Sequence, residues 1–357
     1  MSGVDNVVLR PAGLTRLDGQ VETWRGVNGA IVTDDVTLER LRRLAIPPAW
    51  THVWASSDPD AAVQATGLDA RGRTQYRYSL EARARADENK FSRMLEFAEA
   101  LPALRQTVQR HLTAPVENHT TLHRVVASVV RLLDFGLFRI GNERYAKSNH
   151  TYGLLTLRRR HVRVSGSVMN FEFVGKEHLE HDVLVEDADA AAVVRALLNR
   201  SDDPSERLFA IGAPPAQRAL SSATVNSYLH CHSGQAATAK VFRTWGATVA
   251  AATVAAGAPL SEGLPRHRAL ALNAFEAAAE VLGDTPAVAR ASYVHPAALS
   301  VGTGNAVREA VERVLTDKPA ATYRSAMRDP TVQATVLKSL LTSVKANSSM
   351  VKKGSST

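Results

Sequence analysis

The spacing of the apolar residues changes near residue 90, and this change constrains the fold more than any other feature of the sequence. Before it, short apolar runs are broken by Gly and Pro, as over 46–50, which is typical of short strands and turns. One short helix is predicted near 37–44, with Asp34 or Asp35 as its N-cap. From Phe91 onward, the apolar residues recur with the helical period of 3.6.

The second region is predicted to be mainly helical, with one interruption. Helices are expected from Phe91 and over 118–137, where apolar residues share one face. Over 154–185, apolar residues alternate between glycine turns, which predicts a short antiparallel sheet. The helical period then returns and continues to about Leu341.

These patterns predict an α+β fold in three parts. Residues 1–90 are expected to form a small β-rich N-terminal domain, and residues 91–342 a larger, mainly α domain that carries the short antiparallel sheet. Residues 343–357 contain three lysines and no acidic residue, so we expect them to be a disordered basic tail.

The chain carries a net charge of +8, which suits a polyanionic partner such as nucleic acid or an anionic membrane surface. A basic surface without such a partner is the alternative that charge alone leaves open. The longest apolar stretch, 247–258, is too short to span a bilayer, so we expect no membrane segment.

Cys231 is the single cysteine, which excludes an internal disulfide and a site built on several thiolates. It also favours a reducing intracellular compartment. His178 and His181 have a spacing that suits a metal, but they fall in the predicted hairpin without further ligands. We interpret them as a solvated pair and expect no metal site and no cofactor.

Chemistry is indicated by five separated segments together and not by any one of them. The segments are LFRIGNERY at 137–145, FVGKE at 173–177, AKVFRTWG at 239–246, LGDTP at 282–286 and ASYVHP at 291–296. The first is placed at the end of a helix and the second at a hairpin tip. Chance does not explain five such segments in one order along a chain.

In this order the segments resemble the type IB topoisomerase family, in its short poxviral and bacterial form. The resemblance covers most of the chain and includes 154–157 and the run from 46–50 to 75–78. It implies a catalytic domain at 91–342, an N-terminal DNA clamp at 1–90, double-stranded DNA as the partner, and a monomer. If the source is bacterial, the expected location is the cytoplasm and nucleoid.

The resemblance implies that Tyr293 attacks a backbone phosphate, joins the enzyme to the DNA 3′ end and frees a 5′-hydroxyl. A phenol with a pKa of about 10 is a weak nucleophile at neutral pH, but phenolate is a better leaving group than an alkoxide. The covalent bond therefore stores the energy of the broken phosphodiester, and resealing needs no ATP.

Four further residues are given roles by the same resemblance. Arg139 and Arg243 would hold the non-bridging oxygens, because permanently charged, bidentate donors fit the negative transition state. Lys176 would protonate the departing 5′-oxygen as a general acid, with its pKa lowered by the neighbouring arginines. Lys240, one helical turn before Arg243, would support proton transfer or contact the DNA.

Asp284 departs from the family pattern, which usually places His or Asn there as a hydrogen-bond donor to the phosphate. A carboxylate accepts and does not donate, and it repels the phosphate. Asp284 can help only if it is protonated, or if it is turned toward Arg139 or Arg243 as an orienting partner.

The DNA grip is expected to involve both domains. Gln75, Tyr76 and Tyr78 share a predicted strand that Arg73 precedes, and the resemblance implies that they touch DNA. Tyr145 would touch the backbone near the cut. An alternative interpretation, core aromatics on a small sheet, is open for Tyr78 and less so for Tyr76. Phosphate contacts would make the affinity fall steeply with salt.

Two other functions remain as alternatives. A tyrosine recombinase or integrase would use the same chemistry, but the family resemblance over 46–78 argues against it because recombinases lack this domain. A DNA-clamping protein with catalysis impaired by Asp284 would bind DNA without cutting it.

Overall fold

A computed structural model describes residues 12–17, 19–115, 120–212, 218–260 and 270–354. The chain divides into two compact units, Met1–Lys90 and Phe91–Thr357, and each is described here by itself. Both contain helices and antiparallel strands, so the predicted α+β class is confirmed.

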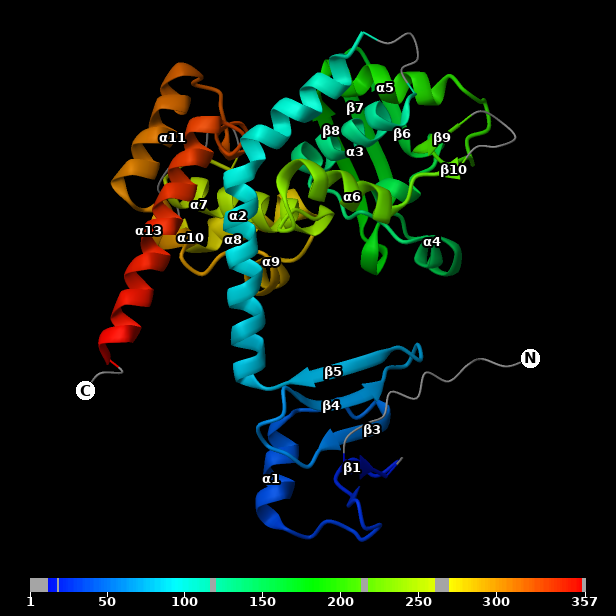
Figure 1. The fold of residues 1–357 in the computed structure, drawn as a ribbon, viewed down its shortest axis with the longest axis vertical. Coiled ribbons are helices and arrows are strands. Elements are labelled where there is room, and N and C mark those ends of the chain that lie inside the picture. The colour runs from blue at the N-terminus through cyan, green and yellow to red at the C-terminus, as the bar shows by residue number, and fades with distance from the viewer. Residues whose placement is uncertain (1–11, 18, 116–119, 213–217, 261–269, 355–357) are drawn as a thin grey trace. The chain divides into compact units, whose positions relative to one another are not determined.

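The first unit is built on a five-stranded antiparallel sheet with the order β2-β1-β3-β4-β5 (Figure 1). Its strands are β1 (Gly13–Arg16), β2 (Trp24–Arg25), β3 (Thr51–Ser56), β4 (Val63–Leu68) and β5 (Thr74–Tyr78). Helix α1 (Asp35–Arg43) packs on this sheet through Leu41. Asp34 caps the helix by accepting a hydrogen bond from the Thr37 amide at 2.8 Å, which confirms the predicted helix and its cap.

Residues 81–90, the last part of the predicted β-rich domain, belong to the 34-residue helix α2 (Leu80–Thr113). The hydroxyl of Ser79 accepts a hydrogen bond from the Ala82 amide at 3.1 Å and so satisfies one of the free amides at the helix start. Ala, Glu, Arg and Lys dominate the first turns, and they are strong helix formers even without an apolar face. The first buried residue of α2 is Phe91, so the sequence shows no apolar period that would predict the start of the helix.

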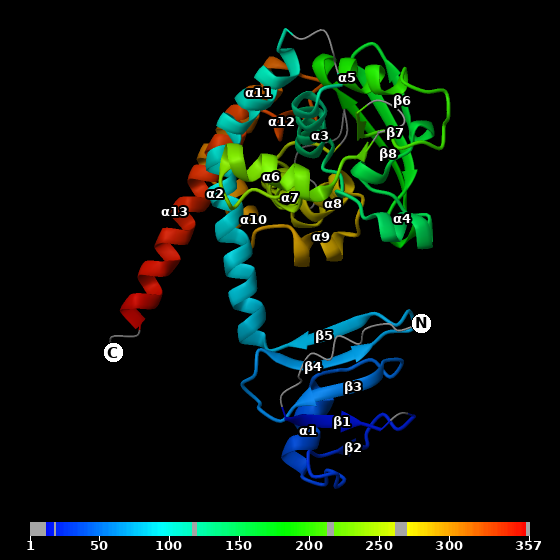
Figure 2. The ribbon, with the colours of Figure 1, turned by 45° about the vertical axis from the view of Figure 1, so that its right-hand side comes forward.

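The second unit is mainly helical (Figures 1 and 2). Its helices are α3 (Leu122–Gly136), α4 (Glu143–Asn149), α5 (Ala188–Leu198), α6 (Ser222–Ser233), α7 (Ala239–Ala255), α8 (Leu270–Leu282), α9 (Pro286–Ser292), α10 (Ala298–Gly302), α11 (Asn305–Asp317), α12 (Tyr323–Ala326) and α13 (Pro330–Gly354). Helix α7 is the centre of the core, because every one of its residues except Lys240 is buried. Helix α3 begins at Leu122, and positions 118–119 of its predicted span lie outside the described residues.

A three-stranded antiparallel sheet with the order β6-β7-β8 interrupts the helices, and α3 and α5 lie against it. Its strands are β6 (Val162–Ser165), β7 (Val168–Val174) and β8 (Glu180–Glu186). The predicted sheet is confirmed, but 154–161 forms two short 3-10 turns instead of a strand. The β7–β8 hairpin carries Lys176 at its tip, as expected. A two-stranded ladder, β9 (Ala210–Ile211) with β10 (Arg218–Ala219), lies apart from this sheet.

The tail prediction was wrong for most of its length, because α13 runs through 343–354. Val332, Val336 and Leu340 are fully buried at four-residue intervals and fix the helix before the polar segment begins. Propagation costs far less than nucleation, and no Gly or Pro follows until Gly354. Residues 355–357 lie outside the described part of the chain.

No helix in the described residues combines the length and the apolar character needed to cross a membrane.

Candidate active site

Arg139 and Arg243 lie together because both bind Asp284. Arg139 donates from one nitrogen, Nη2, to Oδ1 at 2.8 Å and Oδ2 at 2.7 Å of this carboxylate, and Nη2 of Arg243 donates to Oδ2 at 2.9 Å. The side chain of Asp284 is only 7% exposed. The sequence left two possibilities for this aspartate, a protonated carboxyl or an orienting partner of the arginines. In the structure its carboxylate is turned toward the arginines.

Arg139 is placed by the end of helix α3. Leu137 ends the helix in the left-handed conformation, with φ of 49°, so the chain turns sharply before Arg139. The carbonyl of Arg139 then accepts a hydrogen bond from the Leu154 amide at 2.8 Å, and the Ile140 carbonyl accepts from Leu155 at 2.9 Å. The segment 154–157, which sequence could connect with the site only by resemblance, therefore fixes the backbone that carries this arginine.

Arg243 is almost fully buried in the first turns of α7. Nη1 donates to the Leu137 carbonyl at 2.6 Å, and Nη2 donates to the Leu282 carbonyl at 3.1 Å in addition to Asp284. Burial lowers the pKa of Arg243, and the neighbouring Arg139 lowers it further, but a guanidinium stays charged in proteins. Its Nε is buried and has no hydrogen-bond partner within the described residues.

Tyr293 follows helix α9, and its side chain is half-buried. The guanidinium carbon of Arg243 lies 5.0 Å from the centre of the Tyr293 ring. The structure thus places the Tyr293 ring beside Arg243, one of the two arginines that were predicted to share its site.

Thr248 connects the Tyr293 segment to α7, and sequence reasoning missed it. Its fully buried hydroxyl accepts a hydrogen bond from the His295 amide at 3.1 Å. The same hydroxyl lies 2.8 Å from the Thr244 carbonyl and 3.3 Å from the Tyr293 carbonyl. A polar residue five positions after Arg243, in a helix of apolar neighbours, was the available signal.

The two lysines are close to this group in the fold but point to solvent. Lys176 is 65% exposed, and its Nζ pairs with Glu177 at 3.1 Å. Its turn contains Glu177 and His178 with φ of 65° and 59°, an uncommon conformation for residues other than glycine. Lys240 is the one exposed residue of α7 and lies a turn before Arg243.

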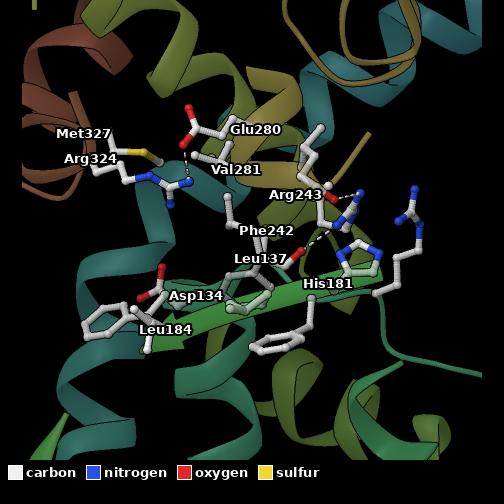
Figure 3. Close-up of a pocket in the computed structure, with 18 of the residues that line it drawn as sticks. Asp134, Leu137, His181, Leu184, Phe242, Arg243, Glu280, Val281, Arg324 and Met327 are labelled. Carbon is white, nitrogen blue, oxygen red and sulfur yellow. Dashed lines mark hydrogen bonds and ion pairs between the residues drawn. The ribbon is translucent and has the colours of Figure 1, made fainter. Parts of the chain in front are cut away.

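A cavity of about 690 Å³ adjoins the arginines (Figure 3). Its lining includes Arg139, Lys176, His181 and Arg243. The interpretation of His178 and His181 as a solvated pair was wrong for His181, which is half-buried with its ring stacked on Phe173. In the described residues, no group of three or more His, Cys, Asp or Glu side chains is arranged to hold a metal ion.

The residues expected to grip DNA are exposed on their own units, except for Gln75, which is half-buried. Tyr76 and Tyr78 are 49% and 45% exposed, and their rings stack with centroids 5.9 Å apart, so the core-aromatic alternative is wrong for both. Arg73 and Gln75 instead bind Asp69, at 2.6 Å and 2.9 Å. Tyr145 lies exposed on α4.

Comparison with known proteins gives the family. The chain matches the family model of the eukaryotic DNA topoisomerase I catalytic core over residues 79–312, and that of the bacterial DNA topoisomerase IB N-terminal domain over 23–69. It is 31% identical over 276 residues to DNA topoisomerase 1B of Acanthamoeba polyphaga mimivirus, covering 75% of this chain and 80% of the relative. It is 23% identical over 287 residues to DNA topoisomerase 1B of vaccinia virus strain Copenhagen, covering 78% and 85%.

The chain therefore belongs to the type IB DNA topoisomerases. It is a type I DNA topoisomerase whose substrate is DNA, as the resemblance predicted. The match over 23–69 also favours this family over the tyrosine recombinases.

Replacement of Asp284 by Asn is expected to keep or raise the rate of DNA relaxation. The amide keeps the size of the carboxylate and can still accept from Arg139, but it removes a negative charge that would repel a phosphate bound there. The rate is measured on supercoiled plasmid. Asp134→Asn, which breaks another buried pair with Arg105 (2.7 Å), controls for lost ion pairing alone. A drop of about a hundredfold in Asp284→Asn, roughly 2.7 kcal/mol of activation free energy, would show that the carboxylate itself is required.

Thr248→Val is expected to slow strand cleavage about tenfold, because one hydrogen bond between α7 and the Tyr293 segment is lost without a change of volume. Single-turnover cleavage measures this effect. Thr253→Val is the matched control, since Thr253 is equally buried on the same helix and bonds only the Val249 carbonyl among the described residues (2.7 Å). Equal cleavage rates for the two variants would show that the Thr248 hydroxyl does not position the Tyr293 segment.

Proposed function

We propose that this topoisomerase relaxes supercoiled DNA by cutting one strand with Tyr293, forming a 3′-phosphotyrosyl intermediate, allowing rotation of the free end, and resealing without ATP or a metal ion. One observation chiefly supports the proposal: Arg243 lies beside both Asp284 and Tyr293. Its Nη2 is 2.9 Å from Oδ2 of Asp284, and its guanidinium carbon is 5.0 Å from the centre of the Tyr293 ring. An anion that replaces the carboxylate on the arginines would therefore lie near the phenol.

The scissile phosphate binds to the guanidinium groups of Arg139 and Arg243. Two guanidinium groups and one carboxylate leave a net positive charge, and a phosphodiester supplies a single negative charge. The buried Nε of Arg243 lacks a partner in the described residues, and leaving a buried donor unsatisfied costs about 1–3 kcal/mol. A phosphate oxygen that accepts from this Nε removes that cost. Asp284 then either shares the arginines with the phosphate or turns aside.

The chemical step exchanges one phosphodiester for another. The bond from the Tyr293 oxygen to phosphorus forms as the bond from phosphorus to the 5′-oxygen breaks. The phenol loses its proton to solvent water, and the 5′-oxygen takes one from Lys176. Because the number of phosphoester bonds is unchanged, the reverse step needs no energy source.

Lys176 has to leave its present partner to act. Its pair with Glu177 is exposed on both sides, and such pairs contribute about 0–1 kcal/mol, so little opposes the change. Lys240 supports proton transfer or contacts the DNA from its exposed position on α7.

DNA is held by both units of a single chain, which acts as a monomer. The stacked pair of Tyr76 and Tyr78 offers apolar contact with the sugars of the DNA backbone. Gln75 lies on the same strand, β5, and Arg73 comes just before it. Tyr145 contacts the backbone from α4. Phosphate contacts supply most of the affinity.

Tyr293→Phe is expected to abolish relaxation and the covalent adduct while DNA binding is kept. Supercoiled plasmid is incubated in EDTA without ATP, and 5′-labelled duplex is denatured in detergent to trap the adduct. Tyr228→Phe, which removes a hydroxyl bonded to His111 at 2.7 Å, controls for the loss of a phenol elsewhere. An unmodified protein that binds duplex but yields no adduct would be a DNA clamp. Exchange of strands between two duplexes in place of relaxation would indicate a recombinase.

Tyr76→Ala is expected to weaken duplex binding several-fold, on the order of 1 kcal/mol, without changing its salt dependence, because it removes contact area and no charge. Lys240→Ala should instead reduce the salt slope by about one unit. Binding isotherms from low to high salt separate the two effects. Val36→Ala, at a 79% exposed position of α1, serves as the neutral control. Unchanged binding by both test variants would contradict the assigned DNA surface.

A further inference from the structure

His181 occupies a place in the candidate active site that no assigned role explains. It lies on β8 opposite Phe173 of β7, and the two rings stack with centroids 5.0 Å apart and planes within 12°. The ring lines the cavity with Arg139 and Arg243, and Figure 3 shows it beside Arg243. This stacking fixes the orientation of the imidazole.

Two glycines leave the space that the ring fills. A Cβ atom on Gly175 would lie 2.4 Å from Nε2 of His181, and one on Gly283 would lie 2.2 Å from Cε1. Gly175 precedes Lys176 and Gly283 precedes Asp284, so the imidazole separates the segments that carry these two residues. Gly175 has an ordinary φ of −97°, so only the space taken by the imidazole requires a glycine there.

The ring nitrogens of His181 are free to bind a ligand. Within the described residues, neither ring nitrogen makes a hydrogen bond. Neither nitrogen is fully buried, so both are accessible to a ligand. Burial lowers the pKa of His181, Arg139 and Arg243 lower it further, and Asp284 opposes them. The imidazole is therefore neutral at neutral pH, with one N–H donor and one acceptor.

We propose that His181 is a further catalytic residue, whose ring N–H donates to a non-bridging oxygen of the phosphate held by Arg139 and Arg243. This inference rests on the proposed function. The carboxylate of Asp284 cannot donate, and the neutral imidazole beside it can. A neutral donor suits this place, because two guanidinium groups already face the ring and a third cation would be repelled.

The test compares His181→Phe with His181→Asn in single-turnover cleavage of a 5′-labelled duplex. Phenylalanine keeps the stack on Phe173 but removes the N–H, so the cleavage rate should fall about a hundredfold, as when one transition-state donor is removed. Asparagine restores a donor and should recover part of the rate. His178→Phe, on the exposed side of the same hairpin turn, should cleave at the parental rate. Duplex affinity and melting temperature are measured for every variant.

Chemical rescue separates donation from space filling. In His181→Ala, added imidazole should restore cleavage, whereas thiophene, a ring of similar size without an N–H, should not. This comparison also decides the question if His181→Phe fails to fold. The inference is overturned if His181→Phe cleaves at the parental rate, or if thiophene rescues as well as imidazole does. A parental enzyme that forms no Tyr293 adduct would instead refute the proposed function itself.

Discussion

The buried charge of Arg243 is the constraint on which the site depends. Its guanidinium is held by the Leu137 carbonyl after α3, the Leu282 carbonyl at the end of α8, and the Asp284 carboxylate. Removing one partner of a buried ion pair typically costs about 3–5 kcal/mol, because the other charge is left uncompensated. Two chain segments far apart in sequence, at 137 and at 282–284, are therefore tied to one side chain of the central helix. Arg139 follows the first of these anchors by two residues.

This arrangement also explains how an aspartate can stand at position 284 in a site that we propose binds phosphate. In the free protein the carboxylate neutralises part of the charge that Arg139 and Arg243 carry. In the proposed mechanism a phosphate takes over that neutralisation, so the substrate replaces the contact that stabilises the free site. The consequence is a lost donor, and the half-buried imidazole of His181, which lines the same cavity as the two arginines, is the replacement that we propose.

The sequence predicted the fold class, the capped helix α1, the short sheet and the hairpin position of Lys176, because each follows from local patterns of apolar residues, caps and glycines. It did not predict the helical start of α2 or the helical end of α13, where charged or polar helix formers show no apolar period. Family resemblance supplied the roles of Arg139, Lys176, Arg243 and Tyr293, which spacing alone does not give. Thr248 was missed and His181 was misinterpreted, because their contacts join distant segments and only the folded chain brings these together.

The most direct test of the account is a crystal structure of the Tyr293→Phe protein bound to an uncleaved duplex. The account predicts that the guanidinium groups of Arg139 and Arg243 both lie within hydrogen-bonding distance of one backbone phosphate. It also predicts that the edge of the substituted ring at position 293 faces the same phosphorus on the side opposite the 5′-oxygen. The account would be contradicted if both guanidinium groups stayed on Asp284 and no phosphate lay within hydrogen-bonding distance of them.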